Sequence, residues 1–250
     1  MTRIILCGYN GRMGHVIRDI VANREDMEIA AGVDVTGGDG EIPVFTDAVQ
    51  CDVDADVIID FSSPKALDSV LSLATGRGIP VVLCTTGYTS EQLEAVTEAA
   101  KHVAILRSAN MSLGINTMAK LIQEAARILA CNGYDIEVVE KHHNQKVDAP
   151  SGTALLLADA MQKVLDDDYE YVYDRSARRM KRPEKEIGIS SVRGGSIVGE
   201  HEVIFAGLDE VIEIKHTAYS KAVFAKGAVN AACFLAGKPA GMYDMSSVVG

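Results

Sequence analysis

Five short apolar runs, separated by longer stretches that suit helices, make up the first hundred residues. The runs cover residues 3–7, 28–33, 56–60, 79–84 and 103–107. Each is no more than six residues long and apolar on both faces, which is typical of strands that helices cover on both sides. The alternation predicts an α/β fold built on a Rossmann-type, doubly wound parallel sheet.

The stretch between the fourth and fifth runs carries the clearest helix signals. A helix is expected over residues 89–102, with Ser90 as its N-cap, Glu91 in its first turn, and Leu93 and Val96 three residues apart.

The pattern changes near residue 108, where a domain boundary is expected. An amphipathic helix over 111–131 leads into a strand over 134–140, and a second helix is predicted over 153–165. Strand candidates at 187–193, 201–205 and 211–216 have no room for helices between them, so antiparallel pairing is expected. The pattern predicts a second, mixed α/β domain with a largely antiparallel sheet, and the chain ends with a helix at 220–236.

The charge balance limits the partners of the chain. The 250 residues hold 24 Lys and Arg against 35 Asp and Glu, a formal net charge of −11. Nucleic acid and anionic membranes are disfavoured as partners because both need a basic surface. No run of 18 apolar residues is present and polar residues interrupt the first apolar stretch, so a cytoplasmic protein is expected. An anionic substrate would need a local basic site.

A glycine-rich loop follows the first run and opens a helix that reaches about residue 23. Its pattern, G-x-x-G-x-x-G from Gly8 to Gly14, is one residue longer than the usual dinucleotide fingerprint. Glycines allow the backbone to approach a pyrophosphate, which the helix N-terminus stabilises. A tight turn that binds no ligand remains the alternative.

Asp34 strengthens the nucleotide interpretation because it ends the second run about 20 residues further on, where a carboxylate accepts hydrogen bonds from ribose hydroxyls. A carboxylate there repels a 2′-phosphate, and Val35 and Thr36 offer no positive charge, so NADH is favoured over NADPH. Arg12 could still reach a phosphate and allow both cofactors.

Polar residues also follow three later runs, at 60–63, 84–87 and 108–111. Ligands bind at the carboxyl edge of open parallel sheets, so these clusters suggest a nicotinamide pocket. Ordinary turn chemistry is the alternative.

The segment from Glu140 to Thr153 is the most informative. It gathers two of the six histidines, His142 and His143, with two lysines between a strand end and a helix start. Pro150 is expected in the first helical turn, where N–H groups have no intrahelical acceptor, so those of Gly152 and Thr153 could hold a carboxylate. Histidine donates protons near neutral pH, and Lys146 could offset carboxylate charge or supply a proton.

Rival chemistries fit this segment less well. Adjacent histidines at a strand end point to opposite sides and no cysteine accompanies them, so no metal site is expected. Ser151 lacks the G-x-S-x-G context of a hydrolase nucleophile. Cys84 ends an apolar strand and is expected to pack rather than react.

Three motifs together resemble 4-hydroxy-tetrahydrodipicolinate reductase, also called dihydrodipicolinate reductase. They are E-x-H-H-x-x-K-x-D-A-P-S-G-T-A, the loop G-x-x-G-R-M-G, and R-G-G-S-I-V-G-E-H over residues 193–201. The resemblance implies NAD(P)H-dependent reduction of a small cyclic dicarboxylate in lysine and diaminopimelate biosynthesis. It also implies a dinucleotide-binding domain over 1–110 and 220–250, a substrate-binding and oligomerisation domain over 111–219, and a homotetramer.

The resemblance further implies roles for individual residues. His142 would donate the proton, Lys146 would be a second donor or a charge partner, and His143, Gly152 and Thr153 would bind the substrate carboxylates. The cofactor would contact one stretch and one carboxylate in the first part of the domain and two later strand ends: Gly8, Tyr9, Asn10, Gly11, Arg12, Met13, Asp34, Cys84, Thr85, Thr86, Ser108, Ala109, Asn110 and Met111.

Two other functions remain open from the sequence. An NAD-dependent dehydrogenase of the aspartate type would share the first domain. A non-catalytic NADH-sensing regulator could use the basic stretch 175–182 on nucleic acid, although nearby acidic residues favour a solvated loop there.

Overall fold

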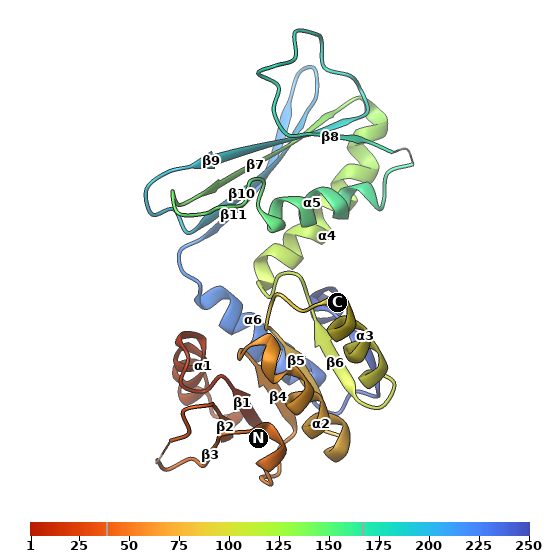
Figure 1. Ribbon diagram of the computed structural model, residues 1–250. Helices are drawn as coiled ribbons and strands as arrows, with labels where there is room; N and C mark the ends of the chain where they lie inside the picture. Colours follow the sequence, from red (N-terminus) through yellow and green to blue (C-terminus); the bar gives the residue numbers. More distant parts are fainter. Residues whose placement is uncertain (39, 167) are drawn as a thin grey trace. The chain divides into compact units, whose positions relative to one another are not determined.

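The computed structural model describes residues 1–38, 40–166 and 168–250, and the chain divides into two compact units (Figure 1). The first unit comprises residues 1–113 and 222–250, and the second comprises residues 114–221. No helix in the described ranges is long and apolar enough to cross a membrane.

The first unit is built on a seven-stranded sheet whose strands all pair in parallel, in the order β12-β6-β5-β4-β1-β2-β3. The strands are β1 Thr2–Cys7, β2 Met27–Val33, β3 Val44–Phe45, β4 Val57–Asp60, β5 Val81–Leu83, β6 Ala104–Arg107 and β12 Gly241–Tyr243. The predicted doubly wound parallel sheet is therefore confirmed. The sequence did not indicate the short edge strands β3 and β12.

Helices cover both faces of this sheet. They are α1 Arg12–Ala22, α2 Leu67–Arg77, α3 Ser90–Ala99, α6 Ala222–Leu235 and α7 Met245–Val249. The residues of β1 are apolar on both sides because both faces of the strand are buried. Ile5 lies in the core beneath α2 and α3, whereas Ile4 and Leu6 lie in the core beneath α1 and α6.

The N-cap of α3 differs from the expected one. Thr89, not Ser90, caps the helix, because its side chain accepts the Gln92 N–H at 3.3 Å while the Gln92 side chain accepts the Thr89 N–H at 3.0 Å. This reciprocal capping box satisfies two N–H groups, which a cap at Ser90 paired with Leu93 could not do.

The second unit packs helices against a five-stranded mixed sheet of order β11-β10-β7-β9-β8. Its helices are α4 Leu113–Leu129, whose first residue belongs to the first unit, and α5 Gly152–Gln162. Its strands are β7 Asp135–His142, β8 Glu170–Val172, β9 Glu186–Arg193, β10 Gly199–Ala206 and β11 Val211–Ala218. Apolar residues of both helices share one core with β7, β9 and β10, which confirms the predicted mixed α/β domain.

One predicted pairing is wrong. Strands β10 and β11 pair antiparallel as expected, but β9 does not pair with β10, because β7 lies between them. The turn after β9 bonds to the end of β7 instead of closing a hairpin: Gly194 N–H donates to the His142 carbonyl and Asn144 N–H donates to the Gly195 carbonyl. Strand β10 then runs back along the other side of β7.

Candidate active site

The glycine loop of the first unit leaves no room for a side chain at Gly8 or Gly14. Gly8 has φ +79°, and a Cβ there would lie 2.5 Å from the Phe61 carbonyl oxygen. A Cβ on Gly14 would lie 2.3 Å from the Gly8 carbonyl oxygen. The loop is thus held between β4 and α1, with bare backbone at the helix N-terminus, as a dinucleotide cradle requires.

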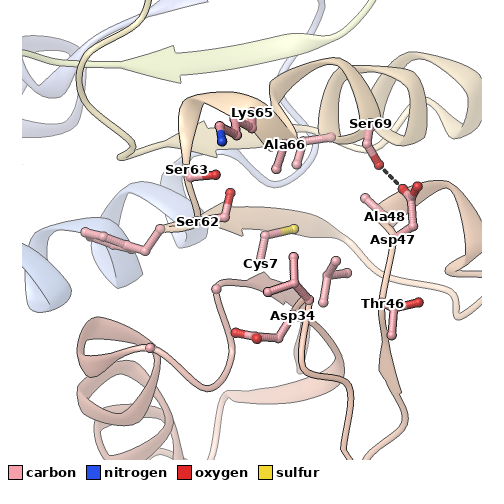
Figure 2. A pocket seen from close by; sticks show the side chains of 16 residues that line it. Cys7, Asp34, Thr46, Asp47, Ala48, Ser62, Ser63, Lys65, Ala66 and Ser69 are labelled. Atoms are coloured by element: carbon pink, nitrogen blue, oxygen red, sulfur yellow. Dashed lines mark hydrogen bonds between the residues drawn. The ribbon is translucent and has the colours of Figure 1, made fainter.

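Beside the loop is a pocket of about 490 Å³ that contains Asp34 (Figure 2). The Asp34 carboxylate accepts the Asn10 N–H at 3.0 Å, the Thr36 N–H at 3.1 Å and the Thr36 hydroxyl at 2.9 Å. Partial burial would raise its pKa, but these hydrogen bonds outweigh burial and lower the pKa. An ionised carboxylate is therefore fixed where a ribose would need an acceptor.

Lys65 lines the same pocket, and Figure 2 shows it on the side opposite Asp34. This cation was not predicted, because only Arg12 and the residues directly after Asp34 were weighed as partners of a 2′-phosphate. The available signal was that Lys65 follows the end of β4, at the carboxyl edge of the sheet.

Only some of the other residues expected to contact the cofactor line this pocket. Gly8 and Gly11 line the pocket, and the exposed Arg12 begins α1. Cys84 to Thr86 follow β5 and Ser108 to Met111 follow β6, outside this pocket. Burial raises the pKa of the Cys84 thiol, in keeping with a packing role. Tyr9 packs on Gly32, and Met111 packs in the core, so their side chains face protein.

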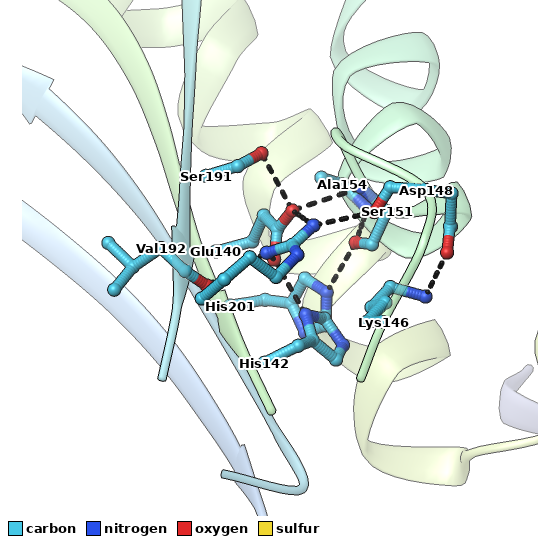
Figure 3. A network of polar contacts seen from close by, with 10 residues as sticks. Glu140, His142, Lys146, Asp148, Ser151, Ala154, Ser191, Val192 and His201 are labelled. Carbon is cyan, nitrogen blue, oxygen red and sulfur yellow. Dashed lines mark hydrogen bonds and ion pairs between the residues drawn. The ribbon is translucent and has the colours of Figure 1, made fainter. Parts of the chain in front are cut away.

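The histidine segment of the second unit is organised around Glu140, which is fully buried in β7 (Figure 3). Its Oε1 accepts the Ser151 N–H at 3.1 Å, the Ser191 hydroxyl at 2.8 Å and Arg193 Nη2 at 2.6 Å. Its Oε2 lies 2.8 Å from Arg193 Nη1 and 2.6 Å from His142 Nδ1. Burial alone would raise the pKa of Glu140, but the bonds from Arg193, His142, Ser191 and Ser151 lower it to about 2.

His142 ends β7, and its ring meets the ring of His201 edge to face, with 5.1 Å between centroids. His201 is buried in β10, and its Nε2 lies 3.1 Å from the Ser151 hydroxyl oxygen. Burial, helped by the nearby His142, lowers the pKa of His201 to about 4, so this ring is neutral at neutral pH.

Ser151 is the N-cap of α5, and its hydroxyl oxygen accepts the Ala154 N–H at 3.1 Å. Pro150 therefore precedes the cap and does not lie in the first helical turn as expected, because Ser151 supplies the capping oxygen that proline lacks. Gly152 and Thr153 are the first two helical residues. Lys146 Nζ lies 2.8 Å from Asp148 Oδ1, and Figure 3 shows this pair beside His142.

Both parts of the chain match models of one family. The N-terminal model of dihydrodipicolinate reductase matches residues 2–111, and the C-terminal model matches residues 114–249. The chain belongs to the dihydrodipicolinate reductase family. It is an NAD(P)H-dependent oxidoreductase and binds a pyridine nucleotide. In the described residues, no group of three or more His, Cys, Asp or Glu side chains could hold a metal ion.

Individual relatives support this assignment over the full length. The chain is 49% identical to a 4-hydroxy-tetrahydrodipicolinate reductase of Clostridium tetani and 50% identical to one of Clostridium novyi, covering 100% of this chain and 97% and 98% of those chains. A solved dihydrodipicolinate reductase from Paenisporosarcina sp. TG-14, bound to dipicolinate, superposes with a TM-score of 0.81 at 25% identity, covering 98% of this chain and 97% of that one. The reductase interpretation is therefore favoured over the aspartate-dehydrogenase and regulator alternatives.

Within the second unit, the structure brings together His142, Lys146 and the N-terminus of α5. His143 follows β7 and is half-buried. Glu140, Arg193 and His201 had no predicted role, although all three lie in the motifs that carry the resemblance. The missed signal was strand periodicity, because residues 140 and 142 of one strand share a face.

Proposed function

We propose that this chain reduces 4-hydroxy-tetrahydrodipicolinate to tetrahydrodipicolinate in lysine and diaminopimelate biosynthesis. The observation that carries the proposal is the buried pair of Glu140 and His142, which lies beside a capped helix N-terminus in a chain that matches this family from end to end.

The first unit is suited to hold the nucleotide, which supplies a hydride when it is bound. The bare backbone of Gly8 and Gly11 would lie against the pyrophosphate, and Asp34 would accept hydrogen bonds from the adenosine ribose. We propose NADH as the preferred cofactor, because the ionised Asp34 repels a 2′-phosphate. Lys65 and Arg12 are the cations that would permit NADPH.

The second unit is suited to hold the substrate and to supply a proton. The first N–H groups of α5, at Gly152 and Thr153, would bind one carboxylate, and His143 and Lys146 would contribute to binding both. His142 would donate the proton that completes the reduction, with Lys146 as a second donor or charge partner. Binding of both carboxylates would orient the ring before reaction.

A coupled assay with enzymatically generated substrate and each cofactor tests this function. We expect turnover with both nucleotides and a higher kcat/KM for NADH. His142→Ala should lower kcat by roughly 10²-fold, the effect of losing a general acid, while NADH affinity, followed by the emission of NADH, is retained. The exposed His102 provides a control, and His102→Ala should retain kcat.

Two results would count against the proposal. Turnover of aspartate without reduction of the dipicolinate precursor would support the dehydrogenase alternative. A near wild-type kcat in His142→Ala would remove His142 from the mechanism.

We further propose that the chain is a homotetramer assembled through the five-stranded sheet. Helices α4 and α5 pack on one face of that sheet (Figure 1). Val192, which alternates with the Glu140-bound Ser191 and Arg193, lies on the other face and is 45% exposed. Sedimentation velocity measures the assembly directly.

A further inference from the structure

We infer that Glu140 is the positioning residue of this active site: its carboxylate holds the Nδ1–H of His142, so that Nε2 is the atom that carries the exchanged proton. The inference rests on the proposed role of His142 as proton donor.

The charge on Glu140 follows from its surroundings. The side chain is fully buried, where an isolated carboxylate would be neutral. Nη1 and Nη2 of Arg193 donate to its two oxygens, one to each, and the Ser151 N–H and the Ser191 hydroxyl add two more donors. A carboxylate supplied with this many donors can act only as an acceptor, so Glu140 is ionised.

The tautomer of His142 follows from that charge. Nδ1 lies 2.6 Å from Oε2 of a group that cannot donate, so Nδ1 must carry a hydrogen. The proton that His142 can gain and lose is then on Nε2. A Cβ at position 199 would lie 3.2 Å from this nitrogen, so Gly199 preserves space around Nε2.

Glu140 also fixes His142 relative to the substrate-binding end of α5. The same carboxylate accepts the N–H of Ser151, which caps α5, and its partner Arg193 donates to the Asp148 carbonyl at 2.7 Å. One buried anion thereby connects the proton donor on β7, the strand β9 and the loop that leads into the helix.

Titratable groups approach His142 from each neighbouring element. Arg193 comes from β9, the neutral His201 from β10, and Lys146 with its partner Asp148 from the loop before α5. Glu140 is the anion in contact with the ring. If Glu140 lost its charge, Arg193 would remain and would oppose protonation of His142.

Glu140→Gln tests the inference because it keeps the shape of the side chain and removes its charge. The pH at which kcat falls on the basic side should move down by about one unit, and kcat at neutral pH should fall roughly 10-fold or more. The matched control is Glu137→Gln on the same strand, since Glu137 bonds Arg182 at 3.0 Å on the opposite face. Its kcat profile should not move.

A second measurement does not depend on activity. Ring ¹⁵N spectra of the free protein, labelled at histidine, should show neutral His142 protonated at Nδ1 in the natural chain. In Glu140→Gln the neutral ring should lose its fixed Nδ1–H tautomer, because the carboxylate that accepts this hydrogen is gone, and in Glu137→Gln the tautomer should be kept.

The outcomes separate this inference from the proposed function. A wild-type kcat in His142→Ala would contradict the proton-donor role, and the inference that depends on it, even if the ring spectra showed the expected tautomer. Loss of kcat in His142→Ala, together with an unmoved pH profile of kcat and an unchanged His142 tautomer in Glu140→Gln, would overturn the inference alone. If Glu140→Gln does not fold, a neutral His142 protonated at Nε2 in the natural chain would overturn it as well.

Discussion

The proposed nucleotide pocket and the Glu140 network differ in the sequence separation of the residues that form their hydrogen bonds. In the first unit, Gly8, Gly11 and Gly14 belong to one loop and the first turn of α1, and Asp34 receives two of its three hydrogen bonds from a residue two positions away. In the second unit, Glu140 accepts bonds from residues 11, 51 and 53 positions away. The glycine loop and the turn at Asp34 are each local in sequence, whereas the Glu140 network exists only after three strands and a helix have assembled.

The difference follows from what each site must overcome. A close backbone approach is limited by sterics, which glycine relieves within a single turn. A buried charge must recover its lost hydration, and this takes several donors that one segment of chain cannot supply. Substitutions that strain the backbone should therefore disrupt the glycine loop, whereas protonation of buried groups should disrupt the Glu140 network.

The largest effect is expected at the glycine loop. Gly8→Ala combines a left-handed φ of +79° with a contact of 2.5 Å to the Phe61 carbonyl oxygen. We expect a loss of about 3 kcal/mol or more in the free energy of unfolding, with nucleotide binding lost, measured by urea unfolding and NADH emission.

Gly78→Ala is the control for backbone strain alone. Gly78 has φ +65°, and a Cβ there would meet nothing within 4 Å, so a loss of about 1 kcal/mol with nucleotide binding retained is expected. Equal effects of the two substitutions would show that the contact with Phe61 is unimportant.

A comparable effect, dependent on pH, is expected in the assembled site. His201 has a pKa lowered to about 4, so the unfolded chain takes up this proton first as the pH falls from about 6.5. The free energy of unfolding should fall by about 3 kcal/mol between pH 6.5 and 4. Glu140, with a pKa near 2, should cause a second loss of similar size between about pH 4.5 and 2.

His201→Gln should abolish the first of these losses and leave the second. Urea unfolding at a series of pH values measures both, with the exposed His102→Gln as the control. An unchanged slope between pH 6.5 and 4 in His201→Gln would show that His201 is not the group responsible.

The smallest effect is expected at Lys65. If it faces a 2′-phosphate, Lys65→Gln should lower kcat/KM for NADPH by roughly 3- to 10-fold and leave that for NADH within about 2-fold, since the lysine is exposed and screened. Lys101→Gln, elsewhere on the first unit, should change neither. No change in the NADPH to NADH ratio would leave Arg12 as the cation to test next.

The sequence predicted the elements better than their pairing. The five apolar runs and the helix at 220–236 were found because burial on one or two faces leaves a periodic pattern. The pairing of β9 was mispredicted because the choice between β7 and β10 as a neighbour depends on contacts distant in sequence. Two helix starts were predicted one residue away from where they lie: Thr89, not Ser90, caps α3, and Ser151 caps α5 after Pro150. Several nearby polar residues can fill a capping position, so the sequence alone does not choose between them.

By itself, the sequence determined the doubly wound sheet, the glycine loop, the acidic residue at position 34 and the histidine segment, because each is encoded by neighbouring residues. Only the tertiary structure decided that Glu140 is the centre of the second site, that Arg193 and His201 join it, and that Lys65 faces the nucleotide pocket. A buried charge and its donors come from separate strands, and their proximity is set by packing rather than by spacing in the chain.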